Sequence, residues 1–159
     1  MKPVIYLLEE QTHQTGSRII KALADKLLKG VIEYDFTIRQ LNLSRDFVNV
    51  FENEFGTLGF FCHEDDRYSP KRLIQFMEEE GCNMIFCTST LKGSIKESYD
   101  ALPFSAYVLK EVSSIFSPMV DIETLVDYRA EKLAERVEFY LDDLKDERSN
   151  NMRLRSMVI

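Results

Sequence analysis

Two short polar segments of this chain carry the residue types that bind phosphate groups and planar ligands. The first, residues 11–17 (QTHQTGS), follows a short apolar run, and the second, residues 88–93 (TSTLKG), follows the apolar residues 84–87. Hydroxyl groups, backbone N–H groups and the positive end of a following helix are the features that hold an anion. Each segment is therefore a candidate ligand-binding turn.

The first segment precedes an amphipathic helix. Apolar residues recur at spacings of three and four from residue 17 to residue 28, and Gly30 is placed to end the helix. We expect the helix to begin at Gly16 or Ser17 and the turn before it to face a phosphate group. The candidate residues are Gln11, Thr12, His13, Thr15, Gly16 and Ser17. The structural alternative is that Thr15 or Ser17 only caps the helix and that His13 is a solvated loop residue.

The second segment joins a buried strand to a helix. Residues 84–87 form an apolar run of the length typical of a strand buried on both faces, and residues 95–102 have helical spacing. The candidate residues between them are Thr88, Ser89, Thr90, Leu91, Lys92 and Gly93. The structural alternative is a simple strand-to-helix turn, in which Gly93 supplies flexibility and Ser94 caps the helix.

The elements that position these turns alternate along the chain. We expect strands at residues 3–8, 31–43, 84–87 and 104–109, the second of them at a sheet edge. Helices are expected from residue 17, from the Ser69 and Pro70 pair to Gly81, over residues 95–102, and from Asp121 to residue 144. This alternation predicts an α/β fold, a doubly wound parallel sheet of four to five strands between two helical layers. The two turns would then meet at the carboxyl edge of the sheet, where such folds bind ligands.

Two stretches fit this scheme less clearly. Residues 44–68 carry five phenylalanines and an acidic HEDD sequence, and we expect a long excursion with a short hairpin at residues 57–62. In the tail at residues 149–159, Met152, Leu154, Ser156 and Val158 alternate with Arg153, Arg155 and Met157, which suits a frayed end or a strand that pairs with a sheet edge. We therefore divide the chain into one domain at residues 1–148 and a C-terminal tail at residues 149–159.

Net charge, hydrophobicity and cysteine spacing limit the kinds of partner that we expect for this protein. The net charge of −7 argues against nucleic acid, which needs a surplus of lysine and arginine on one face. The first apolar run is too short for a signal peptide or a membrane span, so we expect a cytoplasmic protein with no membrane partner. The three cysteines lack the spacing of zinc ligands or of a disulfide framework, and we expect no metal site.

The order of elements and the two turns resemble the flavodoxin-like NAD(P)H-dependent FMN reductase family, which includes quinone reductases and azo reductases. In that family the first turn wraps the FMN phosphate, and it matches residues 11–17 here. The second turn matches residues 88–94, followed by Lys96 and Asp100. The chain departs from the family in having His13 in place of an arginine and in lacking a proline after the strand at residues 84–87.

The resemblance implies an FMN-binding oxidoreductase that takes hydride from NAD(P)H and passes it to a quinone, nitro, azo or flavin acceptor. Because the cofactor carries this chemistry, no catalytic side chain is expected. The resemblance also implies a homodimer. The alternative is a degenerate flavodoxin-like module that has lost the cofactor and acts as a binding or regulatory protein. Glu9 and Glu10, next to the proposed phosphate turn, and the missing arginine favour that alternative.

Overall fold

The computed structural model describes residues 3–10, 13–40, 47–62, 70–90, 107–112 and 121–157. Within these ranges the strands are β1 (Val4–Glu10), β2 (Thr37–Gln40), β3 (Phe47–Glu52), β4 (Thr57–Cys62), β5 (Met84–Thr90) and β6 (Tyr107–Val112). The helices are α1 (His13–Leu28), α2 (Pro70–Glu79) and α4 (Ile122–Met157). The predicted helix at residues 95–102 lies outside the described residues.

The six strands form one mixed sheet in the order β2-β3-β4-β5-β1-β6. Strands β4, β5, β1 and β6 run parallel to one another. β3 is antiparallel to β4, and β2 is antiparallel to β3. The prediction of a purely parallel sheet of four to five strands was therefore wrong. A tight turn at residues 53–56 joins β3 to β4, and such a hairpin necessarily reverses the strand direction.

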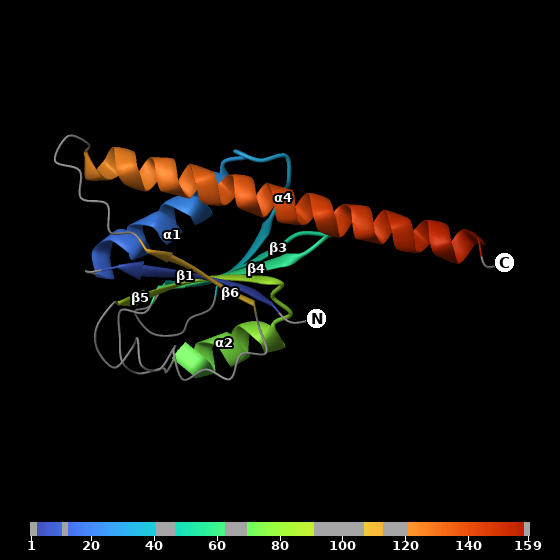
Figure 1. Cartoon of the computed structure of the whole chain (residues 1–159), viewed down its shortest axis with the longest axis horizontal. Coiled ribbons are helices and arrows are strands. Elements are labelled where there is room, and N and C mark those ends of the chain that lie inside the picture. Colours follow the sequence, from blue (N-terminus) through green and yellow to red (C-terminus); the bar gives the residue numbers. More distant parts are fainter. Residues whose placement is uncertain are drawn as a thin grey trace.

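Helices cover both faces of the sheet, as the doubly wound prediction required (Figure 1). On one face, α1 and α4 pack on Tyr6, Phe60 and Phe86, among others. On the other face, α2 packs on alternate residues of the same strands, including Ile5, Phe61 and Ile85. Because successive strand side chains point to opposite faces, a strand buried on both faces is apolar throughout. Residues 84–87 of β5 follow this rule, and all four are buried.

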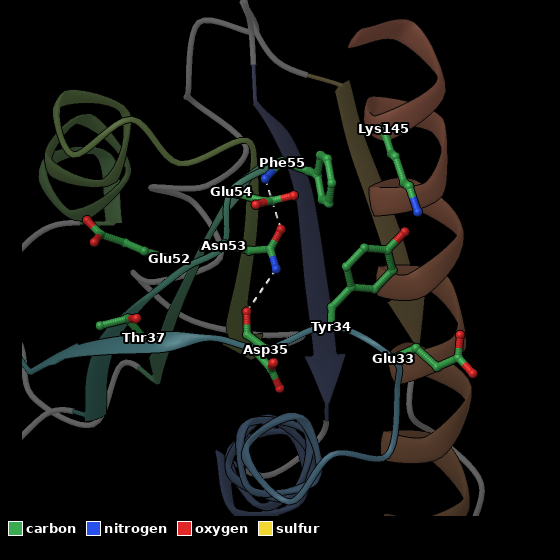
Figure 2. Close-up of a pocket in the computed structure, with 9 residues that line it drawn as sticks. All are labelled: Glu33, Tyr34, Asp35, Thr37, Glu52, Asn53, Glu54, Phe55 and Lys145. Atoms are coloured by element: carbon green, nitrogen blue, oxygen red, sulfur yellow. Dashed lines mark hydrogen bonds between the residues drawn. The ribbon is translucent and has the colours of Figure 1, made fainter. Parts of the chain in front are cut away.

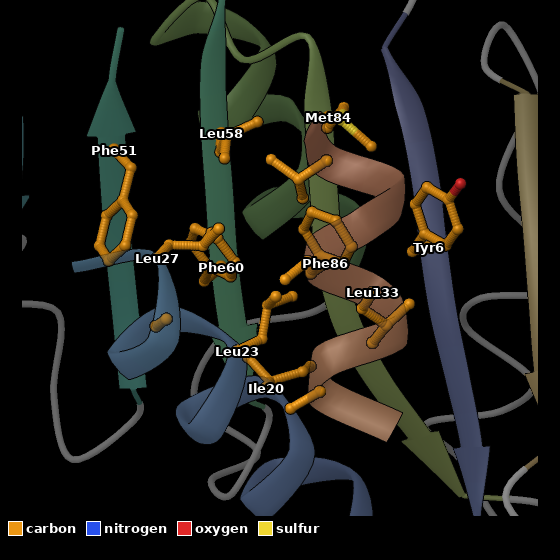
Figure 3. Close-up of a cluster of buried hydrophobic side chains, with 14 of the residues drawn as sticks. Tyr6, Ile20, Leu23, Leu27, Phe51, Leu58, Phe60, Met84, Phe86 and Leu133 are labelled. Atoms are coloured by element: carbon orange, nitrogen blue, oxygen red, sulfur yellow. The ribbon is translucent and has the colours of Figure 1, made fainter. Parts of the chain in front are cut away.

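A row of aromatic rings crosses the sheet under α1 and α4. Phe51, Phe60, Phe86 and Tyr6 come from four adjacent strands, with centroid separations of 4.8, 5.3 and 5.0 Å along the row. Figure 3 shows these rings beneath Leu23 and Leu27 of α1 and Leu133 of α4. Since each ring contacts the next across a strand pair, the row links β3 to β1 by side-chain packing as well as by backbone hydrogen bonds.

Three helix termini follow the sequence signals: the C-terminal ends of α1 and α2 and the N-terminal cap of α4. Gly30 and Gly81, just past α1 and α2, have φ values of 78° and 82°, the left-handed conformation that glycine adopts without strain. At the start of α4, the Asp121 carboxylate accepts a hydrogen bond from the Glu123 N–H at 3.4 Å. The expected ends of α1 and α2 and the expected cap at Asp121 are therefore confirmed.

Outside the centre of the sheet, the observed strands differ from the predicted ones. Of the expected strand over residues 31–43, the described part, residues 31–40, forms a strand only at β2, and Ile32 and Tyr34 are buried in the irregular segment before it. β2 does lie at an edge, as predicted. The region read as a long excursion contains β3 and β4, and β4 is an interior strand that pairs in parallel with β5. The last expected strand, residues 104–109, begins at Tyr107 and ends at Val112.

Helix α4 is longer than predicted. It has 36 residues, which at 1.5 Å per residue span about 54 Å. Residues 149–157, expected to be a frayed end or a strand, continue this helix. Figure 1 shows the C-terminal part of α4 extending beyond the end of the sheet.

Candidate functional site

The two predicted turns leave adjacent strands at the same edge of the sheet. β1 and β5 are parallel neighbours, with Leu8 paired to Thr88 and Glu10 paired to Thr90. The chain after β1 leads to strands on the β5 side, whereas the chain after β5 leads to β6, on the far side of β1. A reversal of this kind between neighbouring strands marks the crevice where open α/β sheets bind ligands.

The first turn is shorter than predicted. α1 begins at His13, so His13, Thr15, Gly16 and Ser17 are helical rather than part of a loop. The sequence 11–17 is polar throughout and lacks the apolar spacing that marks the later turns of α1, which is why the helix start was placed too late. Gly16 and Ser17 are buried. Gln11 and Thr12, and the side chains of His13 and Thr15, fall outside the described part of the chain.

The second turn also begins later than predicted. β5 extends to Thr90, so Thr88, Ser89 and Thr90 belong to the strand and pair with Leu8, Glu9 and Glu10 of β1. Glu9 and Glu10, expected to end the first strand, are part of it as well. Leu91, Lys92 and Gly93 lie outside the described residues.

Ser17 and Thr88 are the only polar residues that are buried among those whose side chains the structure describes. Their exposed fractions are 5% and 1%. Thr88 shares a sheet face with Phe86 and therefore lies on the face that α1 covers. Ser17 of α1 accepts a weak hydrogen bond at its backbone carbonyl from the Cys62 thiol at the carboxyl end of β4, with an S···O distance of 3.8 Å. The two buried hydroxyls thus belong to the same face and the same end of the sheet.

The Ser17 hydroxyl has no hydrogen-bond partner within the described residues. A buried hydroxyl without a partner destabilises the folded state by about 1–3 kcal/mol, so most such groups in proteins are satisfied by protein, water or ligand. Ser17 lies in the fifth position of α1, just after the first turn of the helix. This hydroxyl is the strongest structural sign of a ligand at the predicted edge.

A separate cavity of about 590 Å³ lies at the opposite end of the sheet. We call it the acidic pocket. Four carboxylates and one ammonium group line it, together with two aromatic rings and two small polar residues. Its residues, drawn in Figure 2, are Glu33, Tyr34, Asp35, Thr37, Glu52, Asn53, Glu54, Phe55 and Lys145.

Hydrogen bonds from one asparagine hold the shape of the acidic pocket. The Asn53 amide donates to the Asp35 carbonyl at 2.8 Å and accepts from the Phe55 N–H at 2.9 Å (Figure 2). The first bond ties the β3–β4 turn to the segment before β2, and the second lies within the turn. The ring of Phe55 lies edge-on to that of Tyr34, with centroids 5.9 Å apart.

The acidic pocket has a strongly negative environment. The Tyr34 hydroxyl donates a hydrogen bond to the Asp142 carboxylate of α4. That bond, burial, and the negative charges of Asp142, Glu138 and Asp146 raise the pKa of Tyr34 to about 12. No group of three or more histidine, cysteine or acidic side chains in the described ranges is arranged to hold a metal ion.

Sequence reasoning missed the acidic pocket because its residues come from three separate segments: residues 33–37, the β3–β4 turn and α4. The one available signal was the density of acidic residues at positions 33, 35, 52 and 54. Without the pairing of β2 with β3, nothing in the sequence placed the two acidic pairs side by side.

All three cysteines belong to the hydrophobic core. Cys62, Cys82 and Cys87 are all buried, and none forms a disulfide. Burial, with the nearby charge of Glu80, raises the pKa of the Cys82 thiol to about 12. This side chain is therefore a protonated core residue at neutral pH rather than a nucleophile.

Of the helices in the described part of the chain, none combines the length and apolar character needed to cross a membrane. Comparisons with protein-family models, with curated proteins and with solved structures find no match to this chain.

Proposed function

We propose that the protein binds FMN at the carboxyl edge of β1 and β5 and acts as an NAD(P)H-dependent oxidoreductase toward a small-molecule acceptor. The observation that carries the proposal is the placement of the two buried hydroxyls, Ser17 and Thr88. Both belong to the segments expected to bind the cofactor, and both lie at the carboxyl edge where β1 and β5 are neighbours. Cytoplasmic location and a homodimer remain part of this proposal.

The sheet topology supports the proposed place of the ligand but differs from the flavodoxin order. Flavodoxin-like sheets have the order 2-1-3-4-5 and bind FMN between the first and third strands. Among the parallel strands here, β1 is first and β5 is third, and they are neighbours. However, β1 lies between the third and fourth parallel strands, rather than between the second and third. The family resemblance thus extends to the pair of strands at the site, not to the whole sheet.

The residues at this edge fit the parts of FMN unequally. The N-terminal turn of α1 and the Ser17 hydroxyl suit the phosphate, since both favour a group with negative charge and hydrogen-bond acceptors. The backbone of β5 at Thr88, Ser89 and Thr90 would border the ring system. When bound, the flavin supplies the hydride chemistry, and the protein's part is to orient it and to exclude water.

A titration with FMN tests the proposal, with riboflavin as a matched ligand that lacks the phosphate. We expect FMN fluorescence to be quenched and its absorption bands to shift at micromolar protein. Ser17→Ala should weaken FMN binding about tenfold, because a hydrogen bond to a charged group is lost, and leave riboflavin binding unchanged. Gln75→Ala, at an exposed position of α2, is the control and should bind FMN as the original protein does.

The unliganded Ser17→Ala protein gives a second readout. Its free energy of unfolding should equal or exceed that of the original protein, because the substitution removes an unsatisfied buried hydroxyl. Protein with bound FMN should then oxidise NADH or NADPH in the presence of a quinone. If FMN causes neither quenching nor a spectral shift, the oxidoreductase proposal fails.

The second candidate is a cofactor-free binding or regulatory module on the same scaffold. The strand order favours it, and so does the position of the acidic pocket at the end of the sheet opposite to the flavin edge. A protein that does not respond to FMN, but that self-associates through the surface described below, would match this second candidate.

A further inference from the structure

The end of helix α4 projects from the body of the protein. Among the residues of α4 whose side chains the structure describes, Leu144 is the last that packs on the core, next to the turn at Gly56. Every residue from Lys145 to Met152 is exposed. At 1.5 Å per residue, the helix from residue 145 to residue 157 is about 18 Å long. We call residues 148–157 the C-terminal arm.

The arm differs in charge from the rest of the helix. It carries three arginines, at positions 148, 153 and 155, and no acidic residue. Residues 131–147, directly before it, carry seven acidic and three basic residues. The arm also has an exposed apolar side chain, Met152, with an exposed fraction of 65%. A basic and partly apolar helix end on a chain of net charge −7 is suited to an acidic surface.

The acidic pocket offers such a surface on the same molecule. Glu33, Asp35 and Glu54 form no ion pair within the described residues, whereas Glu52 is paired with Arg39. The pocket edge already holds one guanidinium group: Arg148 donates to the Glu54 carbonyl at 3.3 Å, and its Cζ lies 5.9 Å from the ring centroid of Phe55. This edge can therefore bind arginine through both a carbonyl and an aromatic ring.

Beyond Arg148, the backbone of the arm leads away from the pocket of its own chain. Lys145 lines the pocket, and α4 continues from there as one helix that leads away from the body (Figure 1). Residue 155 lies about 15 Å further along the helix axis than residue 145. Within one chain the helix backbone at positions 153 and 155 therefore lies away from the pocket and its unpaired carboxylates.

We propose that the arm of one copy of this chain docks at the acidic pocket of a second copy, and the reverse, in a two-fold symmetric dimer. If the two arms run antiparallel and cross near residue 151, residue 157 of one copy lies beside residue 145 of the other, at the pocket edge. Each copy then gives an arm and receives one, which is the self-complementary arrangement that a two-fold axis requires. The exposed Met152 lies next to the axis and is covered by the partner arm. This dimer does not depend on flavin binding.

Charge-reversal substitutions on the arm and on the pocket test the proposal with the full-length protein. One variant, Arg153→Glu with Arg155→Glu, makes the arm acidic. The other, Glu33→Lys with Glu54→Lys, makes the pocket basic. We expect the original protein to sediment as a dimer that weakens at high salt, and each variant alone to have a dimer dissociation constant raised by roughly 100-fold. A mixture of the two variants should dimerise again, because every arm then meets a pocket of opposite charge.

A control variant shows whether the dimer is lost because the interface changes or only because the net charge of the protein changes. Lys29→Glu with Lys132→Glu changes the net charge as much as the arm variant does, at exposed positions outside the arm and the pocket. This control should remain a dimer, and circular dichroism should show that all variants are folded. The proposal is overturned if the original protein is a monomer, if both variants remain dimers, or if their mixture does not reassociate. A monomer that sediments with vesicles of anionic lipid would instead assign the arm to a membrane surface.

Discussion

Tyr6 of β1 and Phe86 of β5 stack face to face, with ring centroids 5.0 Å apart and planes inclined by 14°. Phe86 stacks in the same way on Phe60 of β4, at 5.3 Å and 10°. Phe86 therefore links β5 and β1, the two strands that border the proposed ligand edge, to β4 of the hairpin. We expect the stability of the domain to depend on it more than on any exposed aromatic residue.

Phe86→Ala should lower the free energy of unfolding by about 3–5 kcal/mol, because it removes a fully buried ring and leaves a cavity between two stacked neighbours. Urea unfolding followed by circular dichroism measures this loss. Phe139→Ala is the matched control: its ring is 71% exposed, so its cost should stay within about 0.5 kcal/mol. Equal losses for the two substitutions would contradict the role given to the aromatic row.

Gly59 of β4 allows the close approach of α2. A Cβ atom added there would lie 2.7 Å from the Met77 sulfur and 3.0 Å from the Cys82 sulfur. Since Met77 is fully buried, Gly59→Ala should cost about 1–3 kcal/mol of unfolding free energy through overpacking. In Gly59→Ala with Met77→Ala, the combined loss should be smaller than the sum of the two single losses. Strictly additive losses would show that Met77 is not what limits space at Gly59.

The parts of the fold that could be predicted from sequence are those with a local signal. The buried strand at residues 84–87, the ends of α1 and α2, and the cap at Asp121 each follow from periodicity or from the residue type at a terminus. The interior position of β4 depends instead on its pairing with β5, more than twenty residues away along the chain. Residues 57–62 were expected to form a short hairpin by themselves, which was wrong, because they form the single strand β4. No local feature showed that this strand lies between β3 and β5.

The end of α4 shows a second limit of the sequence. Residues 145–152 are exposed on all sides, so they have no apolar stripe to mark them as helical. At the proposed ligand edge, the meeting of the two turns followed from a general rule of parallel sheets. The boundaries of those turns could not be predicted from that rule, because the polar residues of α1 and β5 at this edge resemble loop residues. The burial of Ser17 and Thr88 shows that they belong to a helix and a strand rather than to loops. Burial depends on the tertiary structure and cannot be seen in the local sequence.

The buried cysteines should react with thiol reagents only when the protein unfolds. All three are shielded from solvent, and burial raises the pKa of Cys82 to about 12, so little reactive thiolate is present at neutral pH. Labelling with an aromatic disulfide reagent should be slow in buffer and should modify three thiols per chain in denaturant. Gln75→Cys, at an exposed site of α2, should add one rapidly labelled thiol. Rapid labelling of the original protein would mean that a cysteine-bearing strand opens locally.

The stability of the protein should fall at alkaline pH in a manner that depends on Tyr34. Its pKa is raised from 10.0 to about 12, first of all by the hydrogen bond that it donates to Asp142. Because the folded state binds this proton more tightly than the unfolded state does, the stabilisation is complete below pH 10. It is lost as the pH rises from 10 to 12.

Tyr34→Phe isolates this contribution. The variant should be less stable than the original protein by about 1 kcal/mol near pH 8, since one hydrogen bond is lost. The difference should shrink as the pH approaches 12, because the original protein then loses the same bond. Cys82 and Tyr140, whose pKa values are also raised, are present in both proteins and cancel in the comparison. Urea unfolding at several pH values measures the two curves, with the exposed Tyr128→Phe as control. Parallel curves for Tyr34→Phe and the original protein would show that the Tyr34 hydroxyl does not hold its proton through Asp142.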